Sequence, residues 1–193
     1  MNTYASQRIK PDMKSASFIK KGKVIAVKIR MSGVVGESIV DGPGIRYTVF
    51  VQGCPHHCEG CHNPSTHDFS GGYDDDTDEI LKKILSDPLL DGVTFSGGEP
   101  FCQAKPLAEL GRKVHESGLN VMAYTGFTIE ELMKNANDEN GYAELLNTVD
   151  VLVDGRFVLA LKSYECKFRG STNQRLIDVP QTLKEGHAVI KEL

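Results

Sequence analysis

The chain has 193 residues, of which 40% are hydrophobic and 25% are charged, an ordinary balance for one globular domain. Its formal net charge of -4 argues against a nucleic-acid partner, because phosphate binding usually requires a basic excess or a basic face. No apolar stretch approaches the roughly 20 residues of a membrane-spanning helix, and no signal-peptide core follows the early lysines. We therefore expect a cytoplasmic protein that binds neither nucleic acid nor membrane.

The first predicted strand, residues 47–51, runs directly into a cluster of cysteines. After the glycine pair at 71–72, a helix is expected to begin at a cap formed by Asp76 or Thr77 and to end near Pro88. Its buried stripe should consist of four apolar side chains at helical spacing: Ile80, Leu81, Ile84 and Leu85.

A second strand, residues 93–95, leads into the segment Ser96-Gly97-Gly98-Glu99-Pro100 and then into a helix that stops at Gly118. That helix carries three apolar residues on one face: Leu107, Leu110 and Val114. The remaining predicted elements, in chain order, are a strand at 120–124, helices at 129–133 and 143–146, and a strand at 149–153. Residues after about 162 show no clear helical period, and 168–174 is expected to be a loop.

The repetition of strand, loop and helix predicts an α/β fold with a mainly parallel sheet. Four polar segments each follow the carboxyl end of a predicted strand: the cysteines, SGGE, YTG and VDGRF. Ligands bind at that edge of parallel α/β folds, because all the strand ends open onto one face. We therefore expect the four loops to converge on one site.

Three of the five cysteines, Cys54, Cys58 and Cys61, lie in a C-x3-C-x2-C pattern, whereas Cys102 and Cys166 stand alone. An odd number with this clustering does not fit a disulfide framework, and in a reducing cytosol such clusters are more often metal ligands or redox groups. Three thiolates on one loop can bind three corners of a cubane iron–sulfur cluster and leave one iron open to a small molecule.

Three other interpretations of the cysteines remain open at this point. One is a zinc-binding module without enzymatic activity, in which one of four nearby histidines supplies the fourth ligand: His56, His57, His62 or His67. The others are a catalytic thiol with a histidine partner and a chance cluster with no ligand. Cys102 or Cys166 is either a further thiol ligand or, more commonly for such a residue, a free buried cysteine.

The surrounding motifs give the cluster a context. The chain contains DGPGIR at 41–46, VQGCPHHCEGCHNPST at 51–66, SGGEP at 96–100, VLVDGRF at 151–157 and RGSTNQ at 169–174. From about Gly36 to about Arg175 it resembles the radical S-adenosylmethionine (SAM) superfamily. Within that superfamily it is most similar to the activating enzymes of glycyl radical enzymes, above all those of anaerobic ribonucleoside-triphosphate reductase.

Two details refine this resemblance. Many radical SAM enzymes carry an aromatic residue just before the third cysteine, whereas this chain has Gly60, as the reductase activators do. The pair His62-Asn63, however, is also similar to the pyruvate formate-lyase activating enzyme, so the enzyme that is activated stays open.

The resemblance implies an incomplete (β/α) barrel formed by residues 23–193 as a single radical SAM domain, after a solvated N-terminal tail at residues 1–22. It implies a [4Fe-4S] cluster on Cys54, Cys58 and Cys61 and S-adenosyl-L-methionine at the open iron. Reductive cleavage of the cofactor would give a 5′-deoxyadenosyl radical that removes hydrogen from one glycine of a large partner enzyme. The electron would come from a donor such as flavodoxin.

The resemblance also suggests cofactor contacts, and no residue is expected to act as a catalytic group itself. Gly97 and Gly98 would bring the backbone close to the methionyl group, and Glu99 would accept a hydrogen bond nearby or fix the loop. The expected neighbours of the adenine are Gly60, His62 and Asn63. The expected contacts of the carboxylate, the ribose or a cation are Thr125, Asp154 and Arg156.

Each of these assignments has a structural alternative. A Gly-Gly-Glu segment is often a plain strand-to-helix turn, and Thr125, Asp154 and Arg156 could instead cap turns or form a surface ion pair. We expect His56 and His57 to face solvent. Residues 169–173 would either serve the glycine loop of the partner or close the edge of the barrel.

Overall fold

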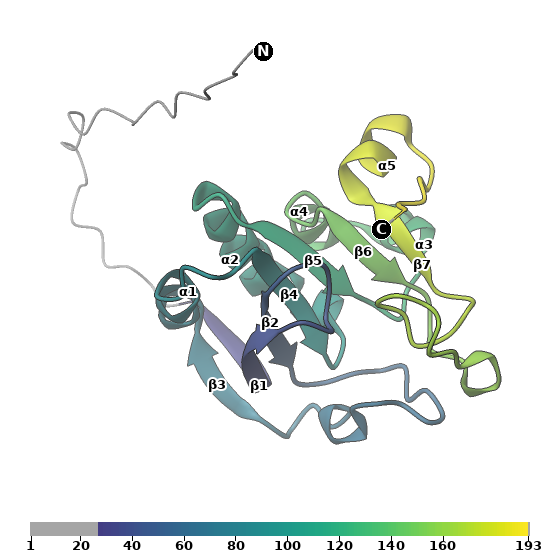
Figure 1. The fold of residues 1–193 in the computed structure, drawn as a ribbon, viewed down its shortest axis with the longest axis horizontal. Helices are drawn as coiled ribbons and strands as arrows, with labels where there is room; N and C mark the ends of the chain where they lie inside the picture. Colours follow the sequence, from purple (N-terminus) through teal and green to yellow (C-terminus); the bar gives the residue numbers. More distant parts are fainter. Residues whose placement is uncertain (1–26, 193) are drawn as a thin grey trace, which may run out of the picture.

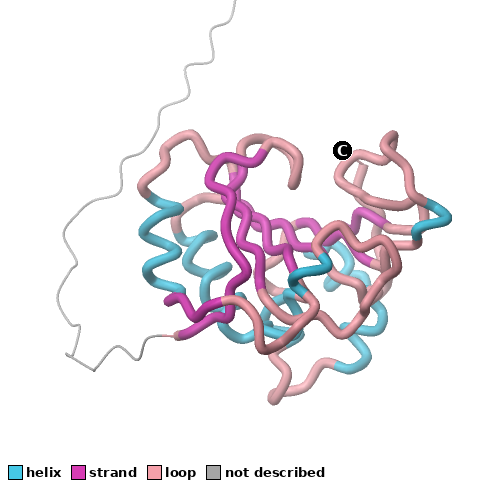
Figure 2. The backbone as a smooth tube through the Cα atoms, turned by 90° about the horizontal axis from the view of Figure 1, so that it is seen from below, coloured by secondary structure: helices cyan, strands magenta, loops and turns pink. Residues whose placement is uncertain are grey.

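The computed structural model describes residues 27–192. The predicted tail at residues 1–22 lies outside the described residues. The described chain forms one seven-stranded sheet in the order β3-β1-β2-β4-β5-β6-β7, with most of its helices packed on one face of that sheet (Figures 1 and 2).

The strands and helices have the following bounds. The strands are β1 (Lys28–Ser38), β2 (Arg46–Val51), β3 (Tyr73–Asp76), β4 (Gly92–Gly97), β5 (Asn120–Tyr124), β6 (Val151–Asp154) and β7 (Arg175–Asp178). The α-helices are α1 (Thr77–Leu85), α2 (Ala104–Glu116), α3 (Ile129–Asn135), α4 (Tyr142–Leu146) and α5 (Val179–Glu185).

The centre of the sheet is parallel and its edges are antiparallel. Strands β2, β4, β5 and β6 pair in parallel, as the strand–helix repetition predicts. The outer strands β1, β3 and β7 pair antiparallel. None of these three was predicted. Strand β1 contains Gly33 and Gly36, which weaken a strand pattern. Strand β3 has the sequence YDDD and β7 has RLID, so neither shows an apolar alternation.

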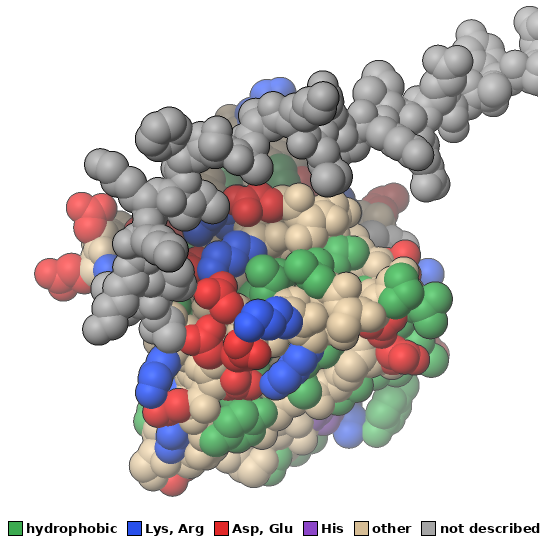
Figure 3. All heavy atoms as spheres, turned by 90° about the vertical axis from the view of Figure 1, so that its left-hand side faces the viewer, with side chains coloured by type: hydrophobic (Ala, Val, Ile, Leu, Met, Phe, Trp, Pro, Cys, Tyr) green, Lys and Arg blue, Asp and Glu red, His purple; other side chains and the backbone are tan. Residues whose placement is uncertain are grey.

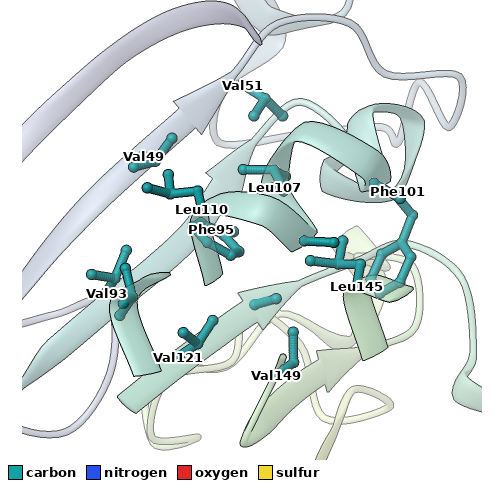
Figure 4. Close-up of a cluster of buried hydrophobic side chains, with 14 of the residues drawn as sticks. Val49, Val51, Val93, Phe95, Phe101, Leu107, Leu110, Val121, Leu145 and Val149 are labelled. Carbon is teal, nitrogen blue, oxygen red and sulfur yellow. The ribbon is translucent and has the colours of Figure 1, made fainter. Parts of the chain in front are cut away.

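One large apolar core lies between the sheet and helices α1 to α4 (Figure 4). Alternate residues of the parallel strands point into it, as the period of a β-strand requires. Those of the three central strands are Tyr47, Val49, Val51, Val93, Phe95, Val121 and Ala123. The helices contribute the residues that the sequence pattern predicted on α2, namely Leu107, Leu110 and Val114.

Helix α1 corrects one prediction. Asp76 caps it by accepting from the Asp78 amide, and Ile80 and Ile84 are fully buried. Leu85, however, is 51% exposed. At about 100° per residue it points roughly 140° away from Ile80 and so leaves the buried stripe.

The opposite face of the same strands is more polar. Arg46, Thr48 and Thr94 are fully buried there. The Arg46 guanidinium donates from Nε to Thr94 Oγ1 at 2.6 Å and from Nη2 to the Val93 carbonyl at 2.7 Å. Burial lowers the pKa of Arg46 to about 10. The same face also holds a small buried apolar cluster, formed by Met122, Val151, Val153 and Leu176. It is therefore enclosed as well, and the buried guanidinium is satisfied by several acceptors.

The sheet curls toward this polar face. Val35 on β1 and residues of the loop between β6 and β7 line one cavity, although three strands separate β1 from β6. Four flat strand spacings would place β1 and β6 roughly 19 Å apart. The curved sheet, with β3 and β7 at its two ends, has the form of the incomplete barrel that the family resemblance implies (Figure 2).

The face that carries α1 and β3 displays acidic and basic side chains next to each other (Figure 3). They pair with one another, as in Lys83 with Asp75 and Lys113 with Asp78. Among the described helices, none combines the length and the apolar character that crossing a membrane demands.

Candidate functional site

A cavity of about 810 Å³ opens at the carboxyl ends of the parallel strands. This volume lies within the usual range for small-molecule and cofactor sites. The cysteine loop, the SGGE segment and the YTG segment all contribute to its lining. From the VDGRF segment, Gly155 and Phe157 reach it. The expected convergence of the four loops is therefore present.

The three clustered cysteines all line this cavity. Cys54 is buried, and Cys58 and Cys61 are partly buried. All five cysteines of the chain are free thiols in the structure. Backbone hydrogen bonds join the start of the cysteine loop to its end. The amide of Gly53 donates to Thr66 O at 2.8 Å, and that of Cys54 donates to His67 O at 3.1 Å.

The sulfur atoms have surroundings that suit metal-bound thiolates. Burial raises the pKa of the Cys54 thiol, while the backbone amides of His56 and His57, both of which donate to it, act in the opposite direction. The amide of Asn63 donates to Cys61 Sγ at 3.4 Å. Three thiols that line one cavity, with amide donors at the sulfurs of Cys54 and Cys61, are a donor set that fits an iron–sulfur cluster.

The zinc alternative finds no support in this arrangement. A zinc site on these cysteines would need one of the neighbouring histidines as its fourth ligand. The neighbouring histidines have other contacts: His56 bonds to Glu99, His57 packs against His67 at 4.9 Å, and His62 packs against Phe157 at 5.0 Å between ring centroids.

Gly97 and Gly98 bring the SGGE segment against the cysteine loop. A Cβ on Gly98 would lie 2.3 Å from the carbonyl oxygen of Gly53, and Gly97 has a φ of +97°, which favours glycine. The Gly98 amide donates to Val51 O at 2.7 Å. Both glycines line the cavity, as expected. The close approach that requires them is, however, to the protein's own backbone.

Glu99 is 1% exposed, and its carboxylate accepts four hydrogen bonds. Oε1 accepts from the amide of Phe101 and the hydroxyl of Thr125 at 3.0 and 2.9 Å. Oε2 accepts from the amide of Gly126 and from His56 Nε2, both at 2.8 Å. Glu99 was expected either to accept a hydrogen bond near the cofactor or to fix its loop. In the structure its hydrogen bonds fix the loop. The Thr125 hydroxyl is likewise engaged within the protein.

His56 corrects another prediction. Its side chain is 4% exposed rather than facing solvent, because it lies between Glu99 and the ring of Phe127, 4.6 Å away between centroids. His57 is exposed, as expected. The sequence held no signal that separates the two histidines, since both lie in the three-residue spacer between Cys54 and Cys58.

The three residues expected near the adenine lie on or beside the cavity. His62 and Asn63 line it, whereas Gly60 does not. Gly60 instead packs against the loop between β6 and β7: a Cβ there would lie 2.8 Å from Leu159 Cδ1. Through this contact and that of His62 with Phe157, the loop between β6 and β7 packs against the cysteine loop.

Asp154 and Arg156 are not among the cavity-lining residues. Asp154 is fully buried and accepts from Arg175 Nε at 2.9 Å and from the Ile129 amide at 2.8 Å. Arg156 is exposed, and its carbonyl accepts from Asn173. The structure therefore shows the capping and ion-pair alternatives for this segment, and the partner of Asp154 is Arg175 rather than Arg156.

The RGSTNQ segment, residues 169–174, closes the end of the barrel. The Gln174 side chain accepts from the Gly170 and Ser171 amides and donates to Gly155 O. Ser171 is fully buried, and its hydroxyl accepts from the Val158 amide. Arg169 lines the cavity, so it is also placed to meet a ligand.

The two isolated cysteines differ in position. Cys102 is exposed and lies outside the cavity lining, whereas Cys166 is partly buried and lines it. Neither is the fully buried thiol that is common for such residues.

Asp41 also lines the cavity, with its carboxylate accepting from Ser38 and Thr48. Asp41 belongs to the DGPGIR motif, whose sequence alone indicates no role for it.

We expect Asp154→Asn to lower the free energy of unfolding by about 2 kcal/mol, because Arg175 would lose its buried charged partner but keep Glu130. Urea unfolding checks this value. Glu130→Gln is the matched control, with a loss below about 1 kcal/mol, because Glu130 is 54% exposed. Wild-type stability with weakened cofactor binding in Asp154→Asn would instead make Asp154 a cofactor contact.

Comparison with known proteins identifies the family. A family described as a 4Fe-4S single cluster domain matches residues 40–177, more than half of the chain. The anaerobic ribonucleoside-triphosphate reductase-activating protein of Salmonella typhi is 38% identical over 146 residues, which cover 70% of this chain and 90% of that protein. The chain belongs to the family of anaerobic ribonucleoside-triphosphate reductase-activating proteins.

Two further comparisons are less extensive. The pyruvate formate-lyase-activating enzyme of Clostridium pasteurianum is 37% identical over 131 residues, 58% of this chain and 55% of that protein. The crystal structure of QueE from Escherichia coli matches with a TM-score of 0.42 and 20% identity over 52% of this chain and 53% of that one, too loosely to support an argument. Membership of the activating-protein family thus rests on sequence, and it agrees with the resemblance noted from the motifs.

Proposed function

We propose that this chain activates anaerobic ribonucleoside-triphosphate reductase by generating a glycyl radical on it, as a radical SAM oxidoreductase. The observation that carries the proposal is that Cys54, Cys58 and Cys61 share one cavity with the SGGE and YTG loops. The cavity therefore offers both a three-thiol cluster site and room for a cofactor beside it. The activating proteins of the reductase are matched over 70% of this chain, against 58% for the pyruvate formate-lyase activator, which favours the reductase as partner.

In this proposal the three cysteines hold one [4Fe-4S] cluster, and S-adenosyl-L-methionine binds next to it. When bound, the two supply reductive cleavage of the cofactor and a 5′-deoxyadenosyl radical that takes hydrogen from a glycine of the partner. Gly97 and Gly98 form the wall against which the methionyl group lies, and His62 and Asn63 flank the adenine. Glu99 and Thr125 hold the loops in place.

Arg156 and Asp154 have a supporting role in this proposal. Asp154 anchors the start of α3 and the beginning of β7 through Arg175, and Arg156 lies in the loop that closes the barrel. Both therefore maintain the shape of the cavity. We propose that the reaction takes place in the cytoplasm with a donor such as flavodoxin, in keeping with five free thiols.

The test is performed without air on protein reconstituted with iron and sulfide. Dithionite and S-adenosyl-L-methionine are added, and 5′-deoxyadenosine is measured; dithionite makes the test independent of the natural donor. Cofactor cleavage by the loaded protein is expected, and its absence would contradict the proposal. Electron paramagnetic resonance then detects a glycyl radical on the reductase. A signal on pyruvate formate-lyase but not on the reductase would reassign the partner.

The mouth of the cavity carries exposed apolar groups on two sides. Val35 and Val40 come from β1 and the loop after it, and they are 44% and 72% exposed. Tyr164, from the loop between β6 and β7, is 90% exposed. Exposed apolar groups at the entrance to a site favour contact with a protein partner. We propose that the glycine loop of the reductase enters between them.

We expect Tyr164→Ser to raise the KM for the reductase several-fold, because an exposed aromatic anchor at an interface contributes on the order of 1–2 kcal/mol. The measurement is the rate of glycyl radical formation against reductase concentration. Tyr73→Ser is the matched control, because Tyr73 is 45% exposed on β3 and does not line the cavity. An equal change in both variants would argue against docking at Tyr164.

A further inference from the structure

The carboxylate of Glu99 joins three separate loops. It accepts from His56 of the cysteine loop, from Phe101 of its own loop, and from Thr125 and Gly126 of the loop after β5. A carboxylate has about four acceptor sites, so the protein itself fills them all. Glu99 thus links, through hydrogen bonds, loops that are far apart in the sequence.

His56 is the residue through which the cysteine loop bonds to the Glu99 carboxylate. Because a carboxylate only accepts, the ring nitrogen Nε2 donates to Glu99 Oε2 at 2.8 Å. The ring packs edge-on against Phe127. A Cβ on Gly126 would lie 2.3 Å from the His56 ring, so the ring occupies space that a side chain at position 126 would need. Glu99, Phe127 and Gly126 together fix the position of the ring.

The backbone of the same residue contacts a cluster ligand. The amide of His56 donates to the sulfur of Cys54. Holding the ring against Glu99 therefore also holds this amide on the sulfur. Hydrogen bonds to cluster sulfurs withdraw electron density and stabilise the reduced form, so they help to set the reduction potential.

We propose that His56 is a positioning residue, anchored by Glu99, that keeps the amide donor on Cys54 and thereby sets the reduction potential of the cluster and its retention. This inference rests on the proposed function, because it requires a cluster on the three cysteines. The role is indirect: it is exerted through the position of the loop and not through a contact of the imidazole with the cofactor.

The test uses the full chain, reconstituted without air. His56→Leu keeps an apolar side chain in the space but removes the bond to Glu99. We expect its cluster to have a more negative midpoint potential in a titration followed by electron paramagnetic resonance. A chelator should remove iron from it about 10-fold faster or more, the usual cost of losing an outer partner of a metal ligand.

Two further variants sharpen the test. His56→Gln can still donate to Glu99 and is expected to recover most of the wild-type potential. His187→Leu makes the same replacement at an exposed histidine far along the chain, outside the cavity lining, and should leave the potential unchanged. A wild-type potential in His56→Leu, or an equal shift in His187→Leu, would overturn the inference.

If His56→Leu does not fold, Gly126→Ala replaces it, because the added methyl displaces the imidazole without removing any polar group. The same negative shift is expected, and a wild-type potential in that variant would overturn the inference. A different result would contradict the proposed function. Wild-type protein that binds no iron–sulfur cluster contradicts that function, whereas a normal wild-type cluster with no effect of the His56 and Gly126 variants contradicts only the role of His56.

Discussion

Cys58→Ala protein is expected to lose the iron–sulfur cluster and to form 5′-deoxyadenosine at least about a thousandfold more slowly than wild type, a barrier increase of about 4 kcal/mol. The physical reason is that the cluster would keep two of its three thiolate ligands, and Cys58 lines the cavity where the cofactor would bind. Iron and sulfide content, the visible absorbance and the product of cofactor cleavage measure the effect.

Cys102→Ala is the matched control for this prediction. Cys102 is exposed and lies outside the cavity lining, so its removal should leave the iron content and the cleavage rate near wild type. If the cluster survives in Cys58→Ala, a residue other than Cys58 is its third protein ligand. Loss of iron in Cys102→Ala to the same extent would show that the assay detects general instability of the loop rather than loss of a ligand.

Gly98→Ala is expected to reduce cofactor cleavage by about a hundredfold. The new Cβ would lie 2.3 Å from the Gly53 carbonyl oxygen, and no side-chain rotation relieves the clash, because the backbone fixes the position of both atoms. The SGGE loop and the cysteine loop must therefore move apart, and a misplacement of about 1 Å at a reacting site can cost two orders of magnitude. We also expect a loss of about 1–3 kcal/mol in the free energy of unfolding from overpacking.

Gly36→Ala serves as the control, because a Cβ at Gly36 has no heavy atom within 4 Å. It should leave both the cleavage rate and the unfolding midpoint close to wild type. Cleavage is measured per bound cluster, so that loss of iron and displacement of the cofactor are separated. If Gly98→Ala cleaves the cofactor at the wild-type rate per cluster, the contact between the two loops does not position the cofactor.

Local patterns in the sequence were sufficient for the centre of the fold. The alternation in strands β2, β4 and β5 and the helical stripe of α2 follow directly from where apolar residues recur, and the structure confirms them. The edge strands β1, β3 and β7 were missed, because glycines interrupt the first, and the sequences YDDD and RLID of the other two show no apolar alternation. Such strands exist because a neighbouring strand pairs with them, which a local pattern does not reveal.

For the site, the sequence by itself determined that the loop with three cysteines meets three glycine-containing loops at one edge of a parallel sheet, since strand ends bring their loops together. Only the tertiary structure decided how the polar side chains there are used. Glu99, Thr125 and Asp154 all carry groups suited to a ligand, yet each bonds to partners from distant segments: Glu99 to His56, 43 residues away, and Asp154 to Arg175, 21 residues away. A buried polar group must find a partner, and whether that partner is a cofactor or another loop depends on which groups the packed chain places next to it.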